Sequence, residues 1–245
     1  MLSWVLVGFV AIGCVYVQAT EFRDTCEYKI ILKITSQFET NSIDLNFESC
    51  AALRDSQGIS AGFIQFTTCS GNVQLVCQEY MALPSSFDFC KKFALPLAAA
   101  SKNPACNMNS FVLMPDGLQD FCQIDIQYQH YFLPATALFQ TYGLTTPLAK
   151  GQLFDANVQL GVIAVPSLAA AATQVAGGSP ATGIDEMKWL SAFLDQRDIY
   201  VRNLGGEYAL TTYRVISYKS MMNNPWFKDG KVTMTRDGVP IYISC

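Results

Sequence analysis

Two carboxylate residues in the stretch 38–71 have the types and settings that acid–base chemistry needs. Glu39 closes an amphipathic run, and Asp55 sits in a polar turn just before a Gly-punctuated apolar segment. Two carboxyl groups in contrasting environments can act as proton donor and proton acceptor, as acid–base cleavage of a glycosidic bond requires. Most surface carboxylates have no chemical role, so the alternative is that Glu39 is a solvated helix-end residue and Asp55 an ordinary turn residue.

Other catalytic arrangements find little support in the sequence. A nucleophilic Ser or Cys needs a base, normally histidine, and the single histidine, His130, lies among aromatic residues. No phosphate-binding loop or dinucleotide-binding glycine motif is found. Without a C-x-x-C pair, one histidine is a poor basis for a metal site, so we expect neither metal nor cofactor.

The element that must position Glu39 is a predicted first helix over 25–38. Ile30, Ile34 and Phe38 recur at the spacing of one helical face, and Thr25 is a suitable N-cap. Glu39 is therefore expected at or just past the C-terminal turn. That end carries the negative pole of the helix dipole, which favours a raised carboxyl pKa, as a general acid needs.

Later segments give a mainly helical pattern with some strand. The run 58–67 fits either a short strand pair or a buried helix, and 73–81 is predicted to be helical. An Ala-rich helix is expected from Pro166 to the glycines at 177–178. The chain is expected to end in a turn and a short strand.

The clearest helix is predicted over 185–204, and it carries an arginine on its apolar stripe. Arg197 lies between Leu194 and Val201 on that stripe. A guanidinium that faces a core needs a carboxylate partner, and the candidates are Asp155 and Glu39. The alternative is that the Arg197 side chain extends to the surface.

The N-terminus and the cysteines indicate a secreted protein. Residues 1–19 contain no charged side chain and are largely apolar, which predicts a cleaved signal peptide, with the mature domain at 20–245. No later segment is long and apolar enough to span a membrane. Eight of the nine cysteines follow residue 19, so up to four disulfides are expected. Their pairing is left open, although Cys245 is expected to tie the C-terminus back.

Charge and length restrict the partners and the architecture. The net charge of −4 argues against a nucleic-acid binder and is compatible with a cationic partner. The mature length suits one large domain or two lobes around a shared cleft.

Several motifs, in the same order, resemble the chitosanases of glycoside hydrolase family 46. The first two are Q-F-E-T-N-S-I-D-L, residues 37–45, and R-D-S-Q-G-I-S-A-G-F-I-Q-F-T, residues 54–67. Then follow G-Q-L-F-D-A at 151–156, D-E-M-K-W-L-S-A-F-L-D-Q-R at 185–197 and D-G-V-P-I-Y-I at 237–243.

The resemblance implies a mainly α-helical, lysozyme-like fold with two lobes, a cleft, a small β element and disulfides. It also implies endo-hydrolysis of a β-1,4-linked glucosamine polymer with inversion, by a protein that we expect to be secreted and monomeric. By position, Glu39 matches the general acid and Asp55 the general base. Ser60 matches the hydroxyl residue that helps to hold the water. Asp155 and Arg197 match the ion-pair network that supports the acid.

Two positions depart from the family pattern at the expected substrate contacts. Gln57 stands where the family has Arg, and Asn72 stands where it has an Asp that recognises the substrate ammonium. Three functions therefore stay open. They are a chitosanase, a lysozyme-like glycosidase for N-acetylated or mixed polymer, and a sugar-binding protein with little turnover.

Overall fold

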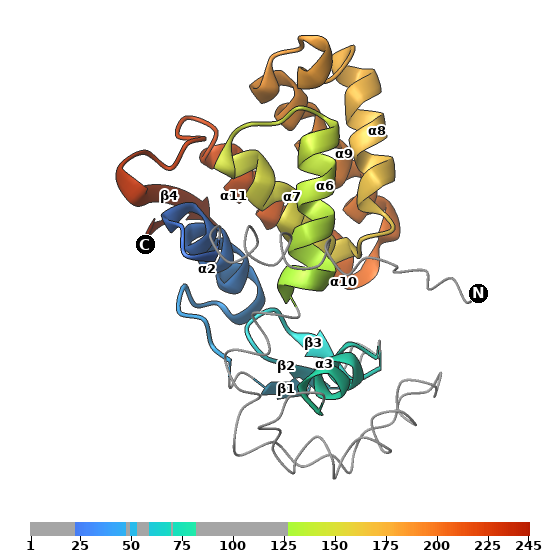
Figure 1. Ribbon diagram of the computed structural model, residues 1–245, viewed down its shortest axis with the longest axis vertical. Helices are drawn as coiled ribbons and strands as arrows, with labels where there is room; N and C mark the ends of the chain where they lie inside the picture. The colour runs from blue at the N-terminus through green and yellow to red at the C-terminus, as the bar shows by residue number, and fades with distance from the viewer. Residues whose placement is uncertain (1–22, 48–49, 53–58, 70, 82–126) are drawn as a thin grey trace, which may run out of the picture.

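The computed structural model describes residues 23–47, 50–52, 59–69, 71–81 and 127–245 (Figure 1). Asp55, Gln57 and the expected signal peptide lie outside these residues, so the structure does not test those predictions. The described part of the chain is mainly helical with two small antiparallel sheets, as predicted. None of its helices has both the length and the apolar character needed to cross a bilayer.

Helix α2, Cys26–Thr40, begins where the sequence predicts and ends two residues later than predicted. The Thr25 hydroxyl accepts a hydrogen bond from the Tyr28 backbone N–H, which caps the first turn. Asn41 ends the helix in the left-handed conformation. Glu39 is therefore part of the last helical turn.

The helical part of the molecule is built around helix α7, Pro147–Leu160, which carries Asp155. Its Thr146 cap satisfies the Ala149 backbone N–H, and Pro147 occupies the first turn, where proline is tolerated. Around it lie a π-helical turn η1, Tyr128–Phe132, and helices α6, Leu133–Thr141, and α8, Val165–Ala176. Helix α8 confirms the predicted Ala-rich helix.

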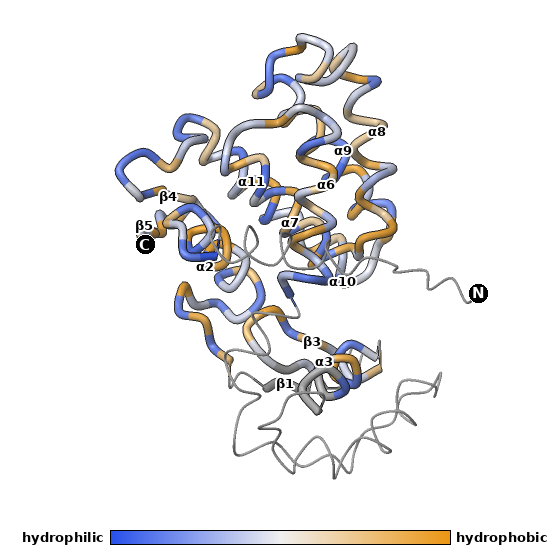
Figure 2. The backbone as a smooth tube through the Cα atoms, viewed as in Figure 1, coloured by the Kyte–Doolittle hydropathy of each residue, from blue (hydrophilic) through white to orange (hydrophobic). Residues whose placement is uncertain are grey.

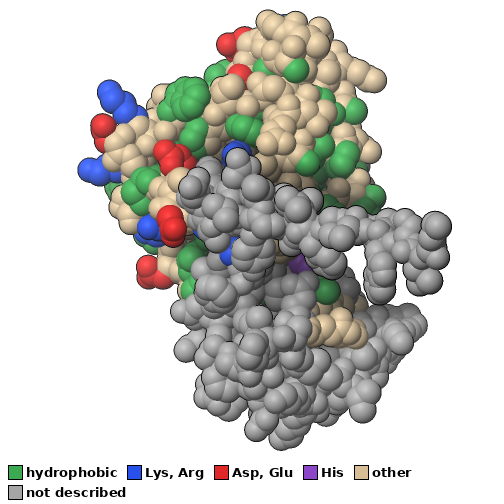
Figure 3. All heavy atoms as spheres, in the orientation of Figure 1, with side chains coloured by type: hydrophobic (Ala, Val, Ile, Leu, Met, Phe, Trp, Pro, Cys, Tyr) green, Lys and Arg blue, Asp and Glu red, His purple; other side chains and the backbone are tan. Residues whose placement is uncertain are grey.

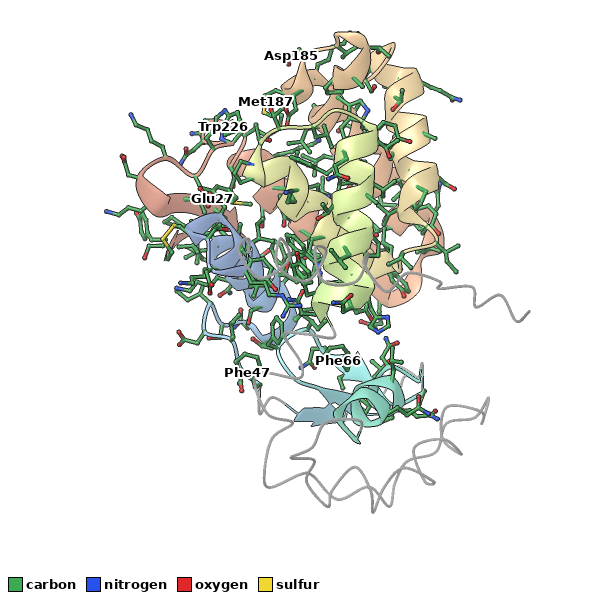
Figure 4. All side chains as sticks on the ribbon, viewed as in Figure 1. Glu27, Phe47, Phe66, Asp185, Met187 and Trp226 are labelled. Atoms are coloured by element: carbon green, nitrogen blue, oxygen red, sulfur yellow. A yellow bond between two sulfur atoms is a disulfide. The ribbon has the colours of Figure 1, made fainter. Side chains whose placement is uncertain are left out.

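Helix α9, Glu186–Leu204, confirms the clearest sequence prediction. Asp185 caps it through the Lys188 backbone N–H, and Gly205 at a positive φ of 70° ends it. Figure 4 shows Asp185 and Met187 at the start of this helix, far from Phe66 in the small three-stranded sheet. On the apolar stripe of this helix, Leu190, Leu194 and Val201 are buried, and Leu204 in the final turn is exposed.

The C-terminal segment contains more structure than the predicted turn and strand. After a turn η2, Pro180–Thr182, and helix α9, the chain forms α10, Gly206–Ala209, η3, Leu210–Thr212, and α11, Tyr213–Ser220. A turn η4, Lys228–Gly230, then leads into a hairpin of β4, Lys231–Arg236, and β5, Val239–Ser244. Charged side chains gather around this hairpin on the face shown in Figure 3.

The second sheet resolves the ambiguity of residues 58–67 in favour of strands. Strands β1, Cys50–Ala52, β2, Ile59–Ala61, and β3, Phe66–Thr67, pair antiparallel in that order. Helix α3, Asn72–Met81, packs beside β3 (Figure 1). This small unit lies below the helical bundle, next to the C-terminal end of α2, and Figure 2 shows apolar backbone positions where the two parts meet.

One continuous core joins these elements. Its largest fully buried apolar side chains include Trp189, Phe193, Phe154 and Phe63. A disulfide between Cys26 and Cys245 fastens the start of α2 to the C-terminus, which confirms that the last residue is tied back.

Candidate active site

The Glu39 carboxylate lies in the last turn of α2 and pairs with Arg214 of helix α11. Glu39 Oε1 accepts a hydrogen bond from Arg214 Nη2 at 2.6 Å. The Glu39 side chain is 13% exposed and that of Arg214 is 6% exposed, so the pair is largely removed from water. Ion pairs in such settings require further partners to offset the cost of desolvation.

Asp155 supplies one of these partners and joins the pair to a second arginine. Its Oδ1 contacts Arg214 Nη1 at 3.1 Å, and its Oδ2 contacts Arg197 Nη2 at 2.7 Å. The Asp155 and Arg197 side chains are fully buried. The result is a chain of alternating charges in the order Arg197, Asp155, Arg214 and Glu39, drawn from helices α9, α7, α11 and α2.

Gln159 extends this network toward the surface. Its carbonyl oxygen accepts from Arg197 Nε at 2.8 Å and also contacts Nη2. Its amide nitrogen donates to Thr211 Oγ1 at 2.5 Å, and that hydroxyl donates to the Tyr208 carbonyl at 2.6 Å. The buried charges are thereby linked to α10 and η3.

Burial raises the pKa of Glu39 above its ordinary value, and the neighbouring Arg214 opposes this only in part. Asp155 adds to the increase in the Glu39 pKa, while Arg197 lowers it. Burial, with a smaller effect of the Glu39 charge, also raises the pKa of Tyr131 to about 12. A carboxyl group with a raised pKa holds its proton to higher pH, as a general acid must.

Glu39 is accessible from a pocket of about 430 Å³. One wall comes from the turn between β2 and β3, at Ile64 and Gln65. The opposite wall comes from helix α7, from Gly205 after α9, from α10 and from η3. Its residues are Val158, Gln159, Gly205, Gly206, Glu207, Tyr208 and Thr211. The pocket therefore lies between the small sheet and the helical bundle, and it holds a second carboxylate, Glu207.

The structure brings together three of the residues singled out in the sequence. Glu39, Asp155 and Arg197 belong to one network, and Arg197 is buried rather than extended to the surface. Of the two carboxylate candidates, Asp155 pairs directly with Arg197, whereas Glu39 is linked to it only through Arg214 and Asp155.

The predicted water-holding and substrate residues lie in the small sheet unit. Ser60 is 2% exposed in β2, opposite Thr67 of β3, and is not part of the pocket wall. Asn72 is half-buried at the first position of α3 and is also outside that wall.

Sequence reasoning missed Arg214, which is the direct partner of Glu39. Arg214 precedes Tyr218 by four residues and Met221 by seven, so it lies on an apolar helical face just as Arg197 does. The segment 208–245 was expected to contain a turn and a strand, and the short helix α11 was not considered. Within the described ranges, no group of three or more His, Cys, Asp or Glu side chains is arranged to hold a metal ion.

Comparison with known proteins gives a consistent result. Residues 118–236 match the model of "Glycosyl hydrolase family 46", a range that contains Asp155, Arg197 and Arg214. A chitosanase from Bacillus subtilis (strain 168) is 31% identical over 179 residues, which are 67% of this chain and 64% of that protein. The chain thus matches slightly less than two thirds of the length of this relative.

Solved structures show the same fold. A native chitosanase from Bacillus subtilis MY002 aligns with a TM-score of 0.78 and 24% identity, over 90% of this chain and 99% of that one. A family 46 chitosanase from Gynuella sunshinyii, in complex with chitotetraose, aligns with a TM-score of 0.76 and 24% identity, over 90% and 98% of the two chains. The mainly α architecture with a small β element, predicted from the sequence, is confirmed.

Proposed function

The chain belongs to glycosyl hydrolase family 46, and we propose that it is an endo-acting chitosanase. In this proposal it cleaves the β-1,4 linkages of chitosan with inversion of configuration. Glu39 is the general acid and Asp55 is the general base. The curated relative and the structural neighbours that share the fold are named as chitosanases.

The observation that carries the proposal is the position of Glu39. Its carboxyl group is largely buried, borders a pocket and has a raised pKa. Burial keeps the proton available for the leaving oxygen of the substrate. After transfer, Arg214 stabilises the carboxylate through the contact at 2.6 Å.

The role of Asp55 rests on its place in the sequence. It precedes strand β2 by four residues, and β2 leads into the turn whose Ile64 and Gln65 line the pocket opposite the bundle. An inverting enzyme places its two carboxyl groups about 6.5–9.5 Å apart, with the attacking water between them. Ser60 would help to hold that water, as its position in the motif implies.

The charge of the pocket fits an amino-sugar polymer. Glu207 adds a carboxylate to the pocket that holds Glu39, and chitosan carries an ammonium group on each deacetylated unit. A carboxylate binds an ammonium group about twice as strongly as a neutral acceptor does. Tyr208 lies beside it and offers an aromatic face to a sugar ring.

A second candidate is favoured by Asn72 and Gln57, which stand where the family pattern has charged residues. Neutral amides there suit N-acetylated or mixed polymer, as in a lysozyme-like glycosidase. A sugar-binding protein with little turnover would keep the pocket but lack the chemistry.

We further propose that the protein is secreted and acts as a monomer. The Cys26–Cys245 disulfide and a second disulfide at Cys69 are what an oxidising compartment permits. Mass spectrometry of the culture medium would test cleavage near Ala19, and gel filtration would test the oligomeric state.

The deciding experiment is a reducing-end assay on chitosans of graded acetylation. Turnover of deacetylated polymer supports the chitosanase. Turnover confined to acetylated polymer supports the second candidate. Binding without turnover of any substrate contradicts both.

A further inference from the structure

Helix α2, which carries Glu39, is fastened to the C-terminal hairpin at three points along its length. At its start, Cys26 is bonded to Cys245. At its middle, Lys33 Nζ donates to the Ser244 carbonyl at 2.7 Å. At its end, the guanidinium of Arg236 in β4 reaches the last turn.

The Arg236 contacts satisfy groups that a helix end leaves without partners. Its Nη1 donates to the Gln37 carbonyl at 2.6 Å and to Asn41 Oδ1 at 3.0 Å. The Gln37 amide nitrogen donates to the same Asn41 oxygen at 3.2 Å. The last carbonyls of a helix have no partner within the helix, and a cation there also complements the helix dipole.

Arg236 also contacts Tyr213, which precedes Arg214, the partner of Glu39. Its Cζ lies 4.6 Å from the centre of the Tyr213 ring. The Tyr213 hydroxyl donates to the Phe38 carbonyl at 3.4 Å, and the Arg214 guanidinium lies 5.3 Å from the centre of the Phe38 ring. One side chain of β4 thus holds the end of α2 and the start of α11 together.

We propose that Arg236 is a positioning residue for the general acid. It keeps the last turn of α2 closed and holds that turn against α11, so that the Glu39–Arg214 pair keeps its geometry and its burial. It does this without touching the substrate, and the inference rests on the proposed role of Glu39.

The expected consequence follows from what surrounds Glu39. Arg214 faces it from α11, with Asp155 of α7 and Arg197 of α9 behind. Tyr131 of η1 and Glu207 of the pocket wall are further titratable neighbours in the described part of the chain. Burial is the largest cause of the raised Glu39 pKa. Loss of Arg236 opens the last turn to water, which moves that pKa toward its ordinary value.

The test compares Arg236→Met with Arg236→Lys and with the control Lys231→Met, an exposed cation on the same strand. We expect Arg236→Met to lower kcat roughly 10-fold to 100-fold, as small misplacements of a catalytic group do. KM should change little, and the alkaline limb of the kcat profile should move to lower pH. Arg236→Lys should recover part of the loss, and Lys231→Met should match the wild type.

A second readout separates this inference from the proposed function. The pKa of Glu39 is measured by carboxyl ¹³C NMR titration in the wild type and in each variant, whether or not chitosan is cleaved. An unchanged Glu39 titration in a folded Arg236→Met protein overturns the positioning role. If that protein does not fold, Arg236→Gln carries the test, since it also removes the guanidinium that contacts the Gln37 carbonyl, Asn41 and the Tyr213 ring. An unchanged titration there has the same meaning.

Discussion

Glu39 and Arg214 are 175 positions apart in the sequence, and their side chains meet at 2.6 Å beside the pocket. The arginine is shared, because its other nitrogen contacts Asp155 at 3.1 Å. Glu39 therefore has a cationic partner whose charge is partly balanced by another carboxylate. This explains how a carboxyl group beside an arginine can keep a raised pKa while its conjugate base is still stabilised.

The raised pKa of Glu39 predicts a pH-dependent stability. The folded protein binds the Glu39 proton more tightly than the unfolded chain does, because the pKa of Glu39 is raised on folding. Protonated Glu39 therefore contributes to the free energy of unfolding below about pH 4.5, the ordinary pKa of the group. This contribution is lost as the pH rises through the pKa of Glu39 in the folded protein. Glu39→Gln removes this titration. The variant should therefore gain stability relative to the wild type as pH rises through that window, in urea unfolding at successive pH values. If the wild type instead became more stable relative to the variant as the pH rises over this range, the predicted direction of the Glu39 pKa shift would be wrong.

The buried charge network predicts a large loss of stability when one partner is removed. Asp155→Asn leaves two buried guanidiniums without their shared carboxylate, and we expect a loss of about 3–5 kcal/mol in the free energy of unfolding. Lys219→Met is the matched control, because it breaks a single exposed pair with Asp195. Its melting temperature should stay close to that of the wild type. Equal effects of the two substitutions would show that the network adds nothing beyond a surface pair.

The disulfide at the start of α2 gives a prediction that complements the one for Arg236. The Cys26→Ser/Cys245→Ser double variant should lose about 2–4 kcal/mol of stability, chiefly because the unfolded chain becomes less constrained. Its kcat below the unfolding temperature should stay near the wild-type value, since Arg236 still holds the other end of the helix. Thermal unfolding and an activity assay at low temperature measure both. A loss of kcat in the folded variant would show that the Arg236 contacts at the end of α2 do not by themselves keep Glu39 in position.

The pocket carboxylate and the neutral residue at position 72 predict opposite effects on substrate binding. Glu207→Gln should weaken binding of deacetylated oligomers, and Asn72→Asp should tighten it, each by roughly 2-fold to 10-fold, a typical range for one charged hydrogen bond. Isothermal titration with glucosamine oligomers and their N-acetylated counterparts measures this. Both effects should vanish with the acetylated oligomers. Equal changes for both ligands would argue against recognition of the ammonium group.

The parts of the fold that depend on local chemistry could be predicted from the sequence. Thr25 and Asp185 cap their helices, and Gly205 ends α9, because each satisfies backbone groups within a few residues. The sequence also predicted that a buried Arg197 would need a carboxylate partner and named Asp155 as one of two candidates, and the structure shows the pair with Asp155.

The parts that depend on contacts between distant elements could not be predicted. The sequence identified Glu39 as a candidate acid but not its partner, Arg214, which lies on the eight-residue helix α11. A helix this short has too few residues for its apolar pattern to show which side faces the core, so packing against other elements decides it. The hairpin partner of the last strand, and the Arg236 contacts to the end of α2, likewise require the tertiary arrangement. No local signal joins residues almost 200 positions apart.

In the proposed reaction, Glu39 donates the proton that cleaves an amino-sugar polymer. The most direct test is the rate of reducing-end formation from deacetylated chitosan by the wild type and by Glu39→Gln, with circular dichroism and oligomer binding as checks on the fold. We predict turnover by the wild type and a loss of about 10²–10⁴-fold or more in kcat for the variant, with binding retained. Turnover by a folded Glu39→Gln protein at the wild-type rate would contradict the claim.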